Sequence, residues 1–234
     1  MKLLIKLSGE SLSGTDRDTR NQYDELTLDS IARQIKMLQE GGHIIALVIG
    51  GGNLFRGHEL TGKLAIERPT ADYIGMLATI QNALVLRDYF ESKGIETRVS
   101  SAITMSQICE SYIPKRALRH MEKGRVVIFA AGLGVPYFTT DSTSVQRALE
   151  MKMDMLIMAK NGVDGLYTAD PDKDPKATFI KEISAGEVLE RNLKVADQSA
   201  IALAKEHGLA IKILGVSDIS RAVESTVGSI ISPK

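Results

Sequence analysis

Short apolar runs alternate with longer amphipathic segments along the 234 residues of this chain. The apolar runs are nearly continuous and rich in β-branched residues, which is typical of parallel strands covered on both faces. They predict strands at residues 2–8, 43–49, 95–100, 125–130, 154–159 and 210–214. The alternation predicts an α/β fold in which a mainly parallel sheet carries helices on both faces.

The segments between these runs place apolar side chains three or four positions apart, and a glycine ends each of the clearest ones. They predict helices over residues 27–41, 70–93 and 197–207. Ser184 and Glu187 form a capping-box pattern that begins a further helix. Prolines in residues 161–175 exclude a central strand or helix there and favour a loop with a short hairpin at residues 166–168.

We expect one sheet shared by two lobes, an N-terminal lobe of about residues 1–150 and a C-terminal lobe of about residues 151–234. The formal net charge is zero and no basic stripe is present, so direct nucleic-acid binding is not expected. No apolar run approaches the length of a membrane span. The single cysteine, Cys109, fits a reducing compartment and is expected to be structural. We therefore expect a cytoplasmic protein.

A lysine and a small-residue turn end the first predicted strand. Lys6 leads into Leu7, Ser8 and Gly9, and ligands in open α/β sheets bind outside the carboxyl ends of the strands. Glycine lets backbone N–H groups approach a ligand, so this turn is a candidate for holding the β- and γ-phosphates of a nucleotide. The spacing is not that of a P-loop, and a lysine at a strand end also reaches solvent without any ligand.

Three consecutive glycines follow the second predicted strand. Gly50, Gly51 and Gly52 precede Asn53, and Arg56 comes three residues later. One glycine is enough for a turn, so three favour a backbone in contact with a ligand. The planar guanidinium of Arg56 suits phosphate oxygens. Two such turns side by side predict an anion cradle, which indicates a phosphate-handling enzyme.

A loop of mixed chemistry follows the fourth predicted strand. Residues 131–142 combine glycines, two adjacent aromatic side chains and several hydroxyl groups. Backbone donors, a stacking surface and hydroxyls together suit a nucleoside monophosphate. Thr140 or Asp141 is equally a candidate for a simple helix N-cap. Asp141 is also a candidate for orienting Lys6 or for helping to place Mg²⁺ beside nucleotide phosphates.

Two weaker candidates lie elsewhere. In the segment around Tyr167 and Asp170, the aromatic ring suits an adenine base and the carboxylate suits sugar hydroxyls, although its Asn-Gly and Asp-Gly pairs are also ordinary turn formers. Asp72 begins the long predicted helix, where the helix dipole favours an acidic residue, and it is also suited to accept hydrogen bonds from a ribose. No residues have metal-ligand spacing, so no resident metal site is predicted.

Four motifs, taken in order, resemble the bacterial uridylate (UMP) kinase family, a branch of the amino-acid kinase superfamily. They are KLSGE from Lys6, GGGNLFRG from Gly50, YFTTDS from Tyr137 and VDGLYTADP from Val163. The first and last are shared loosely with aspartokinase and glutamate kinases, and the middle two are specific to the UMP branch. The resemblance covers essentially the whole chain. It implies a three-layer α/β/α sandwich, assembled as a homohexamer.

The resemblance also implies an activity, transfer of the γ-phosphoryl of Mg-ATP to UMP in pyrimidine nucleotide synthesis. The implied catalytic residues are Lys6, Arg56 and Asp141. The implied ATP contacts are Lys6, Leu7, Ser8, Gly9, Gly52, Arg56, Asn161, Tyr167 and Asp170. The implied UMP contacts are Gly51, Asp72, Leu133, Gly134, Val135, Pro136, Tyr137, Phe138, Thr139 and Thr140. Many relatives carry a glycine-rich stretch tied to GTP activation where this chain has residues 15–22, so allosteric control by GTP or UTP stays open.

Two alternative functions remain at this level. The acceptor is a carboxylate in aspartokinase and acetylglutamate kinase, which share the superfamily. A non-catalytic nucleotide sensor or nucleic-acid-associated regulator is an alternative of a different class. An acceptor phosphate is already anionic and needs no general base, which agrees with a sequence that contains no obvious base.

Overall fold

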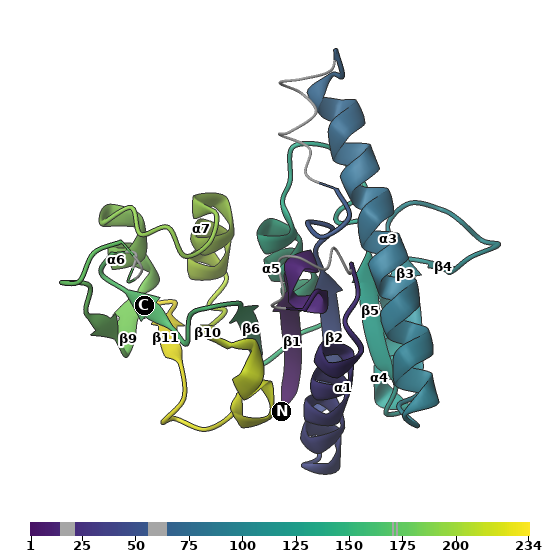
Figure 1. The fold of residues 1–234 in the computed structure, drawn as a ribbon, viewed down its shortest axis with the longest axis horizontal. Helices are drawn as coiled ribbons and strands as arrows, with labels where there is room; N and C mark the ends of the chain where they lie inside the picture. Colours follow the sequence, from purple (N-terminus) through teal and green to yellow (C-terminus); the bar gives the residue numbers. More distant parts are fainter. Residues whose placement is uncertain (15–21, 56–64, 170, 172) are drawn as a thin grey trace.

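The computed structural model describes residues 1–14, 22–55, 65–169, 171 and 173–234. Within these residues, nine strands form one sheet in the order β4-β3-β5-β2-β1-β6-β10-β11-β9 (Figure 1). Its strands are β1 (Lys2–Leu7), β2 (Ile44–Ile49), β3 (Thr97–Ser101), β4 (Glu110–Ser111), β5 (Val126–Ala130), β6 (Met155–Lys160), β9 (Glu182–Ser184), β10 (Ile211–Gly215) and β11 (Ser229–Ser232). Only the β10–β11 pair is antiparallel among the pairings of this sheet, which confirms the mainly parallel sheet.

A separate two-stranded sheet pairs β7 (Leu166–Tyr167) with β8 (Phe179–Ile180) in antiparallel register. This pairing confirms the short hairpin that the sequence predicts inside an otherwise irregular segment. The edge strands β4 and β9 and the strand β11 next to β9 were not predicted. Each has only two to four residues, which is too short for an alternation or an apolar run to be recognised.

Apart from α4, the described helices follow the segments expected from the sequence, with small shifts at their ends. They are α1 (Glu25–Glu40), α3 (Arg68–Ser92), α4 (Pro114–Glu122), α5 (Thr140–Glu150), α6 (Ala185–Glu190) and α7 (Gln198–Glu206), with 3-10 turns η1 (Gly9–Leu12) and η2 (Val216–Arg221). The capping box of Ser184 and Glu187 is present with both of its hydrogen bonds. The short helix α4 was not predicted from the sequence, because it buries only Ala117 and Met121.

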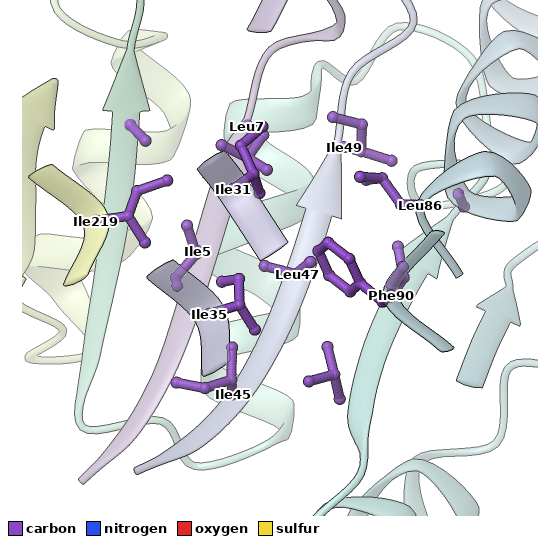
Figure 2. Packing of buried hydrophobic residues seen from close by; sticks show 14 of the residues in the cluster. Ile5, Leu7, Ile31, Ile35, Ile45, Leu47, Ile49, Leu86, Phe90 and Ile219 are labelled. Carbon is purple, nitrogen blue, oxygen red and sulfur yellow. The ribbon is translucent and has the colours of Figure 1, made fainter. Parts of the chain in front are cut away.

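Two apolar layers cover the two faces of the sheet. In Figure 2, Ile31 and Ile35 of α1 lie over strands β1 and β2, while Leu86 and Phe90 of α3 lie beside Ile49 and Leu47 of β2 on the same face. Helices α4, α5, α6 and α7 bury their apolar side chains against the other face. Both layers contain residues from the two ends of the chain, so the core is continuous across residue 150. This arrangement is the predicted α/β/α sandwich (Figure 1).

The period-two geometry of a strand decides where Lys6 points. Leu3, Ile5 and Leu7 of β1 pack with α1 on one face, while Leu4 packs in the opposite layer. Because alternate side chains of a strand point to opposite faces, Lys6 lies on the same face as Leu4, beneath α5. None of the described helices is long and apolar enough to cross a membrane.

Candidate active site

The two glycine turns that the sequence predicts to be neighbours are in direct contact. Strands β1 and β2 are adjacent and parallel, and the backbone N–H of Gly50 donates to the carbonyl of Leu7 at 2.9 Å. A Cβ atom added to Gly9 would lie 2.5 Å from the backbone nitrogen of Gly52. No side chain fits between the two turns, so glycine at position 9 is what allows them to approach. The predicted juxtaposition is confirmed.

Lys6 forms a buried ion pair with Asp141 beside these turns. Its Nζ lies 2.9 Å from Oδ1 of Asp141, and the lysine is 7% exposed. Burial by itself raises the pKa of Asp141, but the nearby charges of Lys6 and Lys160 outweigh it and bring the pKa below its ordinary value. The carboxylate is therefore charged at neutral pH and holds the lysine in place. This contact was one of the roles considered for Asp141 from the sequence.

Lys160 is a second cation at this site, partly buried, and the sequence reasoning assigned it no role of its own. It ends strand β6, which pairs with β1 so that Lys6 lies opposite Met158. Since Met158 packs in the layer of α5, Lys160, two positions further on, points to the same face as Lys6. Its Nζ donates to the carbonyl of Val195 at 2.7 Å. The signal that selected Lys6, a lysine at the carboxyl end of a parallel strand, also applies to Lys160.

The loop after β5 leads into the N-terminus of α5. Ala131, Gly132, Gly134 and Tyr137 all have positive φ angles, a backbone path that favours glycine. Tyr137 and Phe138 are 66% and 55% exposed, so both rings are accessible to a ligand. The loop ends at Thr139, whose side chain accepts from the backbone N–H of Ser142 and caps the helix.

The expectation that Thr140 or Asp141 caps this helix is therefore wrong. Both residues already lie in the first turn of α5, and Thr139 is the N-cap. The N-cap could not be chosen from the sequence, because threonine, aspartate and serine are all good caps and follow one another in residues 139–142. The shift frees Asp141 to face β1, where it meets Lys6.

Asp197 joins residues 131–139, the loop predicted to contact the acceptor and called the acceptor loop below, to the segment before α7, a role that no sequence pattern indicates. Its carboxylate accepts a short hydrogen bond from the hydroxyl of Thr139. It makes no side-chain cap for α7, although it occupies the N-cap position. An aspartate in front of a helix is ordinarily read as a cap, so its link to residue 139, 58 positions away, required the structure.

Asp72 lies against the same acceptor loop. One carboxylate oxygen accepts from the backbone N–H of Tyr137 at 2.8 Å, and the other accepts from Nε of Arg68 at 2.8 Å. The guanidinium of Arg68 also lies over the ring of Tyr137. Helix α3 therefore places Asp72 beside the predicted UMP-contacting residues.

A pocket of about 500 Å³ opens beside Lys160. Tyr167, Leu193, Val195 and Ile213 are among the residues that line it, which gives it apolar walls next to a cation. Tyr167 is fixed by a hydrogen bond from its hydroxyl to Asp164 at 2.8 Å and by edge-to-face packing on Phe179. The dimensions and walls suit a flat base with its phosphates directed toward the lysine.

Arg56, Asp170 and Asn161 were also predicted to contact ATP. Arg56 and Asp170 lie outside the described residues. Asn161 is exposed and lines a smaller hollow that also includes Lys160. Within the described parts of the chain, no group of three or more His, Cys, Asp or Glu side chains is arranged to hold a metal ion.

The family model described as the amino acid kinase family matches residues 1–215. The chain belongs to the amino acid kinase family. A family member named uridylate kinase from Paenarthrobacter aurescens (strain TC1) is 47% identical over 236 residues, which cover 99% of this chain and 94% of that protein. Another uridylate kinase, from Tropheryma whipplei (strain Twist), is 50% identical over 222 residues, 95% of this chain and 94% of that protein.

Solved structures of similar proteins share the fold. The UMP kinase from Bacillus anthracis matches with a TM-score of 0.92 at 38% identity, over 100% of this chain and 96% of that one. The UMP kinase from Ureaplasma parvum matches with a TM-score of 0.89 at 34% identity, over 99% of this chain and 98% of that one. The resemblance noted from four sequence motifs is confirmed over the full length of this amino acid kinase.

Proposed function

We propose that this chain is a UMP kinase that transfers the γ-phosphoryl group of Mg·ATP to the phosphate of UMP and yields UDP and ADP. Two uridylate kinases at 47% and 50% identity over nearly the whole chain support the choice of acceptor. The observation that carries the chemistry is the buried Lys6–Asp141 pair. This pair lies on the face of the sheet that α5 covers, next to the turns of Gly9 and Gly52 and next to Lys160.

The chemical task is to bring two polyanions together. At about 4 Å, each pair of unit charges is worth roughly 4 kcal/mol at an effective dielectric constant near 20. Lys6, Lys160 and the N–H groups of the glycine turns would offset this repulsion and stabilise the charge of the in-line transition state. The acceptor oxygen is already an anion, so no side chain has to remove a proton.

Asp141 would act on the lysines rather than on the substrates. Its negative charge favours the protonated form of Lys160 against the effect of burial, and its ion pair fixes Lys6. Asp141 would help to hold the Mg²⁺ that enters with ATP, since this ion ordinarily takes one or two carboxylates together with nucleotide phosphates. The ion would supply positive charge beside the phosphates, and the partly buried carboxylate of Asp141 beside Lys6 and Lys160 supports this role.

The proposed substrate contacts fall into one set for ATP and one set for UMP. We assign ATP to Lys6 and the first glycine turn, Gly52, Arg56, Asn161, the Tyr167 pocket and Asp170. We assign UMP to Gly51, Asp72 and residues 133–140. The N-terminal lobe up to about residue 150 would then carry the acceptor and the remainder the donor. We further propose that the enzyme works as a homohexamer in the cytoplasm, in pyrimidine nucleotide synthesis.

An acceptor panel tests this function. Purified protein, MgATP and one of UMP, CMP, aspartate or acetylglutamate are assayed for ADP formation, with and without GTP and UTP. We expect turnover with UMP and none with the two carboxylates, and the GTP and UTP arms report on allosteric control. Turnover with a carboxylate would assign the chain to another branch of the family. Tight ATP binding without transfer to any acceptor would favour the nucleotide sensor.

Substituting Lys6 tests the mechanism separately. We expect Lys6→Met to lower kcat with UMP by about 10²–10³, the scale for loss of one preorganised donor, with the fold intact by circular dichroism. Lys212→Met is the matched control. Lys212 is also a buried lysine, but it donates to the carbonyl of Ala222 instead of facing the glycine turns. A Lys6→Met enzyme with wild-type kcat would remove this residue from the mechanism.

A further inference from the structure

Helix α3 carries two buried polar side chains that no substrate contact explains. Thr79 is 5% exposed and Asn82 is 0% exposed, while their helical neighbours in the core are mostly apolar. Burying a polar group is costly unless its hydrogen bonds are made. The partners of these two side chains therefore indicate what the residues hold.

Every hydrogen-bonding position of the Asn82 amide is used. Its Nδ2 donates to the carbonyl of Gly50 at 2.7 Å and to Oδ1 of Asn53 at 2.8 Å. Its Oδ1 accepts from the hydroxyl of Tyr23 at 2.9 Å and from Nδ2 of Asn53 at 3.2 Å. An amide offers two donors and two acceptor lone pairs, so Asn82 fixes both ends of the Gly50–Asn53 turn to α3.

Thr79 holds the other loop of the site. Its hydroxyl group accepts a hydrogen bond from the backbone N–H of Ala131 at 2.8 Å and donates one to the carbonyl of Met76 at 2.7 Å. Ala131 is the first residue after β5 and has φ 61°, which is uncommon for a residue with a side chain. The bond therefore anchors the start of the acceptor loop at a backbone position that is unfavourable for a residue with a side chain.

The two anchors lie on one stripe of the helix. Thr79 and Asn82 are three residues apart, which makes them neighbours on the helix surface about 4.5 Å apart along the axis. The Gly50–Asn53 turn lies against the same stripe, because a Cβ on Gly51 would reach Ala78 and the backbone nitrogen of Thr79. One rigid turn of helix α3 therefore contacts both the Gly50–Asn53 turn, which is proposed to bind phosphate, and the acceptor loop.

We propose that Thr79 and Asn82 are positioning residues, which fix the separation between the phosphate-binding turn and the acceptor loop. The inference rests on the proposed phosphoryl transfer. Transfer requires the acceptor oxygen and the γ-phosphorus to be held in line at near contact, and a displacement of about 1 Å can cost about 10²-fold in rate. Hydrogen bonds from two side chains that are neighbours on one helix surface would give such control without touching either substrate.

The test compares isosteric substitutions in the full-length protein with matched controls. Thr79→Val removes the hydroxyl, and Asn82→Asp removes the donors to Gly50 and Asn53. Thr97→Val and Gln34→Glu are the controls. Thr97 is a buried threonine that donates to the carbonyl of Ile95, and Gln34 is a buried amide that donates to the carbonyl of Val216 and accepts from Ser220. Neither control residue contacts the two loops.

We expect Thr79→Val to raise KM for UMP about fivefold or more while KM for ATP stays within about twofold. Asn82→Asp should lower kcat by about tenfold or more, because the turn it holds lies against both substrates. Both controls should lose thermal stability to a similar degree and keep kcat and both KM values within about twofold. Hydrogen exchange at Ala131 should accelerate in Thr79→Val and not in Thr97→Val.

The proposal is overturned if Thr79→Val and Asn82→Asp behave like their controls, with lower stability and unchanged kinetics. If Asn82→Asp does not fold, Tyr23→Phe replaces it. That change removes one of the four bonds of Asn82 and should lower kcat about two- to fivefold, whereas an unchanged kcat counts against the proposal. Wild-type protein that phosphorylates a different acceptor would overturn the UMP assignment alone, and the same KM and kcat comparison would then be made with that acceptor.

Discussion

The surroundings of Lys160 change the pKa of its ammonium group. Burial lowers the pKa of its ammonium group, and the positive charge of Lys6 lowers it further, while Asp141 and Asp197 act in the opposite direction. The net pKa lies below the ordinary value for lysine. A lysine with a depressed pKa loses its proton, and therefore its charge, at a lower pH than a surface lysine does.

This shift predicts an alkaline limb in the pH profile of kcat. As the pH rises through the lowered pKa, Lys160 becomes neutral, the phosphates lose a cation and the rate falls. Lys160→Arg keeps its charge across the accessible range, so the limb should move to higher pH. Lys160→Met should be about 10²-fold slower, on the scale of one lost charge donor, and should lack the limb.

The control for this experiment is Lys212→Met. Burial also lowers the pKa of Lys212, but its Nζ bonds the carbonyls of Ala222 and Glu224. This variant should lose stability and retain the wild-type limb. An alkaline limb that persists unchanged in Lys160→Met would show that another group controls it.

At the scale of elements, the decisive contact is between the Gly50–Asn53 turn and helix α3. A Cβ on Gly51 would lie 2.8 Å from Cβ of Ala78 and 3.0 Å from the carbonyl oxygen of Gly75. Both obstacles belong to a helix backbone or sit directly on it, so they cannot move aside as the end of a flexible side chain can. Overpacking of this kind costs about 1–3 kcal/mol of the free energy of unfolding.

We therefore expect Gly51→Ala to lower the free energy of unfolding by about that amount and to lower kcat/KM for UMP by about tenfold or more, because the turn shifts. Gly75→Ala, on the opposite side of the same contact, is the control. Among the described residues, its Cβ would meet only Phe55, at 3.9 Å, and alanine is the better residue within a helix by about 0.8–1 kcal/mol. Urea unfolding and steady-state kinetics of both variants check the pair, and a destabilised Gly75→Ala would contradict this account of the contact.

At the scale of the whole molecule, the chain leaves large apolar side chains uncovered on the two helices of one face. Leu26 and Met37 of α1 and Tyr73 and Leu77 of α3 are all exposed, and Leu26 reaches 81%. Apolar surface of this kind is used for association in soluble proteins. The proposed homohexamer is consistent with it.

The hexamer predicts a mass close to six times the 25.5 kDa of one chain in light scattering at micromolar concentration. Association through apolar contacts should persist at high salt, since screening weakens charge pairs and not apolar burial. A mass of 25.5 kDa under both conditions would exclude the assembly, while leaving the site within a single chain untouched.

Local patterns in the sequence were sufficient for the six central strands, for most helices and for part of the site. Apolar runs located those strands, since burial on both faces leaves little room for polar residues. Lys6 and the glycines were identified because strand ends and glycine-rich turns are recognisable in one short segment. The capping box at Ser184 carries its own hydrogen-bond partners within four residues, so it too required nothing distant.

Only the tertiary structure decided which side chains meet. The ion pair of Lys6 joins positions 6 and 141, the bond from Thr139 to Asp197 spans 58 positions, and Asn82 holds a turn 32 positions earlier. Each of these residue types also has an ordinary local role, as a solvated strand end, a helix cap or a surface amide. Their function depends on strand order and on which helix covers which face, and these are set by packing of the whole sheet rather than by neighbours along the chain.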